Sequence, residues 1–118
     1  MVRIEQLAEA ALRGDGLLAR SLAQDFLREN ARLADVPQPV TDDRRTLAAS
    51  ASLIELFAVR LKQDAPPWTK GIDPLAEPLF LLKAATTMKR LRALCEIESP
   101  EPLRKRGFFA PPNYLEFA

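Results

Sequence analysis

The chain has 118 residues, of which 47% are hydrophobic and 28% charged, and its formal net charge is +1 at pH 7. This length and balance predict one globular domain, and no uncharged apolar run approaches the ~18 residues that a membrane-spanning helix needs. The lack of histidine excludes Ser-His and Cys-His nucleophile pairs, and a single cysteine, Cys95, excludes an intramolecular disulfide and a cysteine zinc site.

Other familiar sites are also missing from the sequence. No GxxxxGK[ST] or GxGxxG motif is present, so we expect neither a phosphate-cradling loop nor a bound cofactor. Acids interrupt the apolar positions of the first residues, which therefore do not resemble a secretion signal. We expect a cytoplasmic protein without a membrane segment.

The first 35 residues are predicted to form a helical hairpin. Apolar residues recur at helical spacing over residues 2–13, and Gly14 is typical of a position that ends a helix. A second helix is expected over residues 17–34, after a Gly-Asp-Gly turn. The sequence VPQPV at 36–40 then breaks the helix, because proline lacks the amide donor.

Residues 41–63 are predicted to form the central helix of the domain. Asp42 and Asp43 supply negative charge at its start, where the helix dipole is positive, and this role explains the acids better than a metal site does. Apolar side chains then cover nearly the whole circumference, and Glu55 is the only charged residue between positions 46 and 59. A helix of this kind is usually buried on several sides.

The segment 64–78 contains four prolines and a glycine, which predicts an ordered loop. Trp68 is expected to pin this loop to the core through its large apolar area. Helical periodicity returns over residues 78–98, with Pro78 as a first helical residue. This segment is expected to form either one helix or two helices that are separated at Thr86 and Thr87.

Residues 99–118 are predicted to form a basic and aromatic C-terminal strap. A short helix is expected to start at the sequence Ser-Pro-Glu, residues 99–101, and to end at Gly107. Phe108 and Phe109 are expected to anchor the strap to the core. No alternation long enough to require a sheet is present, so the chain is predicted to be all-α: a compact single-domain bundle of about five helices with proline-rich loops and this extended strap.

Two groups of polar side chains have simple structural interpretations. Cys95 lies on the apolar side of its predicted helix and is interpreted as a small buried hydrophobic residue. Glu96, Glu98 and Glu101 are interpreted as solvated or paired with nearby cations, not as an acid/base pair. We therefore predict no catalytic or metal-binding residue.

Positive charge is concentrated late in the chain, where it either forms a solvated face or meets DNA phosphates or a protein surface. No segment has the exposed polar pattern of a DNA-recognition helix, so a protein partner or self-association is favoured over nucleic acid. The tail either packs on its own chain or provides aromatic anchors for that partner. The predicted partner-binding residues are Lys89, Arg90, Arg104, Lys105, Arg106, Tyr114, Leu115 and Phe117.

Four short stretches carry a resemblance. In order they are Pro67-Trp68, EPLF at 77–80, ESPEPLRKR at 98–106 and FAPPNYL at 109–115. This pattern, over about residues 66–118, resembles the C-terminal region of small uncharacterised bacterial proteins encoded beside predicted nucleotidyltransferases, in arrangements similar to toxin–antitoxin pairs. Some of those proteins carry a DNA-binding helical domain in front, which residues 1–60 do not match.

The sequence thus predicts a non-catalytic protein-binding module, and the resemblance implies an antitoxin-like role in a bacterium. Two alternatives remain. One is a small DNA-binding transcriptional regulator, and the other is an enzyme that uses only carboxylates and lysine.

Overall fold

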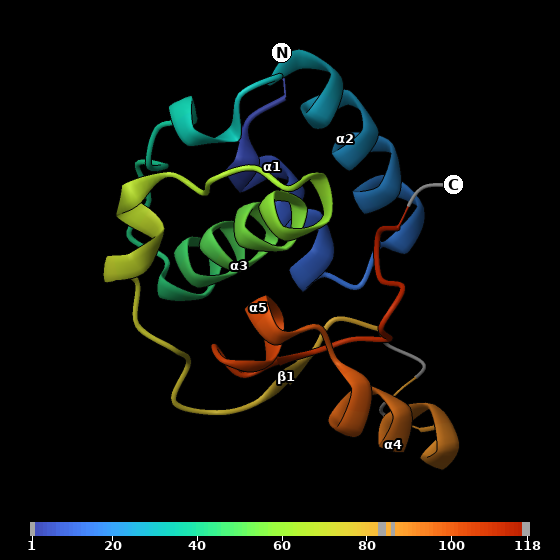
Figure 1. Cartoon of the computed structure of the whole chain (residues 1–118). Coiled ribbons are helices and arrows are strands. Elements are labelled where there is room, and N and C mark those ends of the chain that lie inside the picture. Colours follow the sequence, from blue (N-terminus) through green and yellow to red (C-terminus); the bar gives the residue numbers. More distant parts are fainter. Residues whose placement is uncertain (1, 83–84, 86, 117–118) are drawn as a thin grey trace.

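The computed structural model describes residues 2–82, 85 and 87–116. Within these residues the chain is mostly helical, with five α-helices, two short 3-10 helices and one pair of short strands (Figure 1). The predicted helical fold is confirmed, and the strand pair is a feature that the sequence did not predict. The elements in chain order are α1 (Ile4–Leu12), α2 (Gly16–Glu29), η1 (Leu33–Asp35), α3 (Arg44–Leu61), η2 (Pro67–Gly71), β1 (Leu79–Phe80), α4 (Lys89–Glu98), α5 (Glu101–Arg104) and β2 (Phe108–Phe109).

The first two helices form the predicted hairpin. Gly14 ends α1 with a positive φ of 73°, a conformation that glycine adopts without strain. The carboxylate of Asp15 accepts the Leu18 N–H at 3.1 Å and caps α2. Helix α2 ends at Glu29 and not at residue 34, because the side chain of Asn30 donates to the carbonyl of Phe26 at 2.9 Å and closes the last turn.

Helix α3 lies at the centre of the fold, but it spans Arg44–Leu61 and not the whole of the predicted range 41–63. Asp43 caps it by accepting from the backbone N–H groups of Arg45 (2.9 Å) and Thr46 (3.4 Å). Helix α1 packs against both α2 and α3, and Figure 1 shows α3 (green) enclosed by other parts of the chain. The shared core includes the rings of Phe26 and Phe57, whose centroids are 6.4 Å apart.

The proline-rich segment 64–78 is a loop that contains only the short helix η2. Trp68 pins it as expected, because its ring packs on the core and its Nε1–H donates to the carbonyl of Val36 at 2.8 Å. This contact joins the loop to the segment that leads into α3.

The predicted helix over residues 78–98 is wrong in its first part. Leu79 and Phe80 form β1, which pairs in parallel with β2 in the register Leu79–Phe108 and Phe80–Phe109. An α-helix is present over Lys89–Glu98, and residues 83, 84 and 86, where part of the predicted helix falls, lie outside the described residues. A strand forms here in place of the predicted helix, because the backbone of β2 supplies hydrogen bonds that local periodicity does not reveal.

The strap begins with the short helix α5 and a strand. Ser99 does not cap α5; its hydroxyl donates to the carbonyl of Phe108 and accepts from the N–H of Ala110, both at 3.2 Å. Gly107 stops the turn with a φ of 88°, as predicted, and Phe108 is buried in the core. Residues 110–116 then run back toward the C-terminal end of α3 (Figure 1).

Candidate functional site

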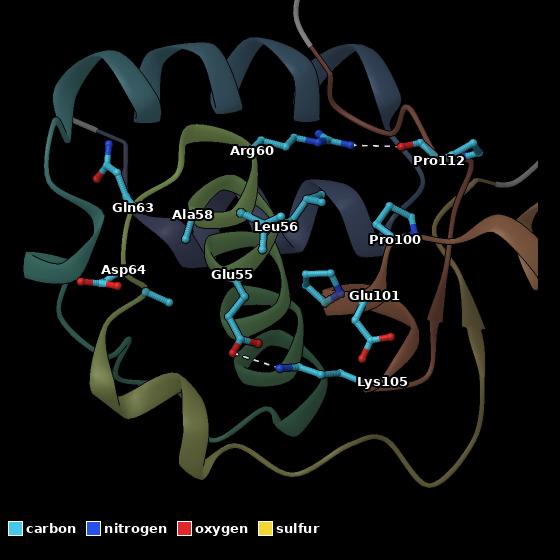
Figure 2. Close-up of a pocket in the computed structure, with 13 residues that line it drawn as sticks. Glu55, Leu56, Ala58, Arg60, Gln63, Asp64, Pro100, Glu101, Lys105 and Pro112 are labelled. Atoms are coloured by element: carbon cyan, nitrogen blue, oxygen red, sulfur yellow. Dashed lines mark hydrogen bonds and ion pairs between the residues drawn. The ribbon is translucent and has the colours of Figure 1, made fainter.

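A groove of about 640 Å³ lies between the C-terminal half of α3 and the strap (Figure 2). We call it the α3–α5 groove. Its apolar lining comes from both sides and includes three prolines of the strap. The lining residues are Glu55, Leu56, Ala58, Val59, Arg60, Gln63, Asp64, Ala65, Pro100, Glu101, Pro102, Lys105 and Pro112.

One end of the groove is closed by a cluster of ion pairs around Glu55. Its carboxylate pairs with Lys105 at 3.1 Å, as Figure 2 shows, and with Arg106. Arg106 also donates to the backbone carbonyls of Thr69 (2.6 Å) and Ile72 (3.3 Å). Arg106 is only 4% exposed, so the prediction that it faces solvent or a partner is wrong. The cation instead ties the end of α5 to α3 and to the η2 loop.

The other end is closed by Arg60, which reaches across to the strap (Figure 2). Its guanidinium donates to the carbonyl of Tyr114 at 2.6 Å and to that of Pro112 at 3.3 Å. Burial lowers the pKa of Arg60, and the nearby carboxylate of Glu116 partly opposes this shift. Two hydrogen bonds to carbonyls thus hold the strap in place.

The aromatic tail packs mainly on its own chain. Tyr114 and Leu115 are buried and belong to the core cluster, so these two predicted partner-binding side chains are not presented at the surface. Burial raises the pKa of the Tyr114 phenol. Phe117, the third predicted residue of the tail, lies outside the described residues.

The charged groups along the groove are mostly engaged. The carboxylate of Glu101 pairs with Arg104 at 3.1 Å, and both side chains are exposed. Asp64 is exposed and has no ion pair within the part of the chain that the structure describes. No pair of unengaged carboxylates converges in the groove, as a carboxylate-dependent acid/base site would require.

The remaining predicted cations lie on α4, away from the groove. Lys89 and Arg90 are both exposed in its first turn. Arg92 pairs with Glu96 at 3.1 Å and lies over the ring of Phe80, 5.1 Å from its centroid. The predicted set is therefore divided between two surfaces: Lys89 and Arg90 on α4, and Arg104 and Lys105 at α5.

Other candidate chemistry finds structural explanations. Cys95 is buried, and this burial, together with a smaller effect of Glu96, raises the pKa of its thiol, which favours the unreactive protonated form. Among the described residues, no group of three or more potential ligands is arranged to hold a metal ion. The described helices include none that is both long and apolar enough to cross a membrane.

The sequence pattern does not single out the residues that form the α3 side of the groove. Val59 and Arg60 come from the last turn of α3, and Asp64 lies in the segment that follows it; in the sequence, none of the three differs from an ordinary residue near a helix end. The sequence does contain one signal for this site, because Glu55 is the one charged residue between positions 46 and 59. A carboxylate buried in such an apolar run needs a cation from another part of the chain to pair with it.

A scan against models of protein families and searches of curated proteins and of solved structures find no match. The groove is thus interpreted from its own shape and charge.

Proposed function

We propose that this protein is a non-catalytic binding module that holds a segment of a protein partner in the α3–α5 groove. One observation carries the proposal. Val59 is 66% exposed beside a groove whose apolar lining comes from alanine, leucine and proline side chains, with charged side chains among them. A large apolar side chain held in water next to such a groove is typical of a protein-binding surface.

The charges of the groove define the chemistry of the partner. Glu55 and Glu101 are already neutralised by cations of the strap, whereas Asp64 has no such partner among the described residues. The best-matched segment has one or two apolar side chains to cover Val59 and a lysine or arginine to meet Asp64. An antitoxin-like role, in which the bound protein is held inactive, is the biological form of this proposal that the sequence resemblance favours.

The same charges argue against the two alternatives. A DNA-binding surface needs several unengaged cations close together, yet Arg92, Arg104, Lys105 and Arg106 each pair with a carboxylate. Of the predicted cations that the structure describes, Lys89 and Arg90 are exposed without an ion pair, and they form a small group on α4. A carboxylate-dependent enzyme needs acids that are poised to exchange protons, and the groove acids Glu55 and Glu101 are held in ion pairs. Both remain candidates of lower rank than a protein-binding module.

Affinity capture from the native lysate tests the proposal. The tagged chain is compared with Val59→Glu, which places a charge in the groove, and with Leu17→Glu as a matched control. Leu17 is 86% exposed on α2 and does not line the groove, so both substitutions add the same charge to an exposed apolar position. We expect a protein that is retained by the wild type and by Leu17→Glu and lost by Val59→Glu.

Two results would contradict the proposal. One is that no protein is specifically retained by the wild type. The other is that Val59→Glu retains the same protein as fully as the control does. Gel shifts at low salt with the upstream DNA of the gene address the regulator alternative, which predicts binding that weakens steeply as salt is added.

A further inference from the structure

Helix α4 exposes two neighbouring apolar side chains and buries little of its own surface. Cys95 is its only buried residue, whereas Ile97 is 71% exposed and Leu94 is 36% exposed. Figure 1 places α4 (orange) at the periphery of the molecule. Ile97 and Leu94 are three residues apart and both exposed, so they lie next to each other on the exposed side of the helix.

The charges of α4 run against the preference of a single helix. Lys89 and Arg90 occupy the first turn, and Glu96 and Glu98 lie near the end, so no acid is in the first turn and no base is in the last. The helix dipole favours the opposite arrangement, with acids at the start of the helix and bases at its end. A local rule broken twice in ten residues points to a compensating contact outside the helix.

A second copy of α4, lying antiparallel, compensates these charges. Arg90 and Glu98 are four residues before and four residues after Leu94, on the same open side of the helix. When two copies cross at Leu94, each Arg90 faces the Glu98 of the other copy. The same register places Leu91 opposite Ile97. Within the part of the chain that the structure describes, neither Arg90 nor Glu98 makes an ion pair or a side-chain hydrogen bond.

We propose that the protein forms a two-fold symmetric dimer through antiparallel pairing of α4, with the axis at Leu94. Such an interface is isologous, which is why one helix must carry both the basic and the acidic member of each pair. Ten residues span about 15 Å, so the contact is smaller than a standard interface of ~800 Å² per partner. A weak dimer follows, with a dissociation constant on the order of 100 µM.

Charge-exchange variants test this register. Arg90→Glu and Glu98→Arg each replace two attractive contacts by two repulsive ones, which is expected to raise the dissociation constant about tenfold or more. Both changes agree with the helix dipole, so neither weakens α4 itself. The double variant R90E/E98R restores both contacts in exchanged form. An equimolar mixture of the two single variants is expected to form a heterodimer, although each alone is monomeric.

Sedimentation velocity over concentrations from about tenfold below to about tenfold above the expected dissociation constant measures these states. Ile97→Lys, on an exposed position, is expected to abolish the dimer with an unchanged circular dichroism spectrum. Val59→Glu is expected to leave it intact, because the pairing does not rest on the groove. A wild type that stays monomeric throughout would overturn the proposal and leave the α4 face to a different protein. A dimer that survives Ile97→Lys, or that R90E/E98R fails to restore, would overturn the stated interface.

Discussion

The guanidinium of Arg106 is a cation that the fold uses internally. It is buried, and its partners are the Glu55 carboxylate and two backbone carbonyls. Removing one member of a buried ion pair leaves the other charge uncompensated, which typically costs about 3–5 kcal/mol. We therefore expect Arg106→Ala to lower the free energy of unfolding by about 3 kcal/mol in urea denaturation.

Arg104→Ala is the matched control for this substitution. Arg104 is two residues away and also pairs with a carboxylate, but that pair is exposed to solvent. Exposed pairs contribute about 0–1 kcal/mol, so this variant should unfold almost like the wild type. Similar losses in the two variants would contradict the role assigned to Arg106.

Tyr114 gives the protein a pH dependence in the alkaline range. Burial raises the pKa of its phenol in the folded state, whereas an unfolded tyrosine titrates near ~10. Above that pH the unfolded chain loses the proton while the folded chain keeps it, so stability is full below pH ~10 and falls as pH rises beyond it. The buried thiol of Cys95 acts in the same direction.

Tyr114 is the only tyrosine, so the ultraviolet absorbance of tyrosinate reports on it alone. We expect the native protein to titrate at a higher pH than the urea-unfolded chain, and Tyr114→Phe to lose less stability between neutral and alkaline pH. Native and unfolded titrations that coincide would show that the phenol is in contact with water.

At the same scale, some single residues were predictable and others were not. Gly14 and Gly107 act through local backbone geometry, and Trp68 through its size, so the sequence predicts their roles. Arg106 stands in a run of three cations that look alike in the sequence. Only the fold places Glu55, 51 residues away, opposite this one.

At the level of the elements, the end of α3 is a strained position. Lys62 follows the helix with a φ of 56°, in the left-handed region that glycine adopts more readily. Replacing it by glycine should raise the free energy of unfolding by about 0.5–1 kcal/mol, because the relief of strain exceeds the entropy gained by the unfolded chain. Lys62→Ala keeps a Cβ atom and should show no such gain. Equal stability of the two variants in thermal unfolding would contradict this reading.

The elements also show where local patterns stop being informative. Helices α1, α2, α3 and α4 follow their apolar periodicity, which is a local property of the sequence. Leu79 and Phe80 belong to the same apolar periodicity but form β1, because β2 offers its backbone 29 residues later along the chain. Part of the apolar side of α4 does not pack against the core, and this exposed part is the basis of the proposed dimer.

For the whole molecule, the α3–α5 groove depends on segments that are distant in the sequence. Residues 55–65 form one wall and residues 100–112 the other, so the C-terminal half of the site was predictable only as a basic strap. The groove requires that this strap return to α3, and the cations that direct the return are Arg60 and Arg106. Of the predicted partner-binding residues that the structure describes, Lys105 alone lines the groove.

The central claim is that the α3–α5 groove contacts a protein partner in the cell. A photoreactive benzoylphenylalanine at position 59 tests it most directly, with the same residue at position 17 as the control. After irradiation of intact cells, we expect position 59 to yield one discrete cross-linked product, with a peptide of the partner attached, and position 17 to yield none. Absence of a discrete product at position 59, or the same product at both positions, would contradict the claim.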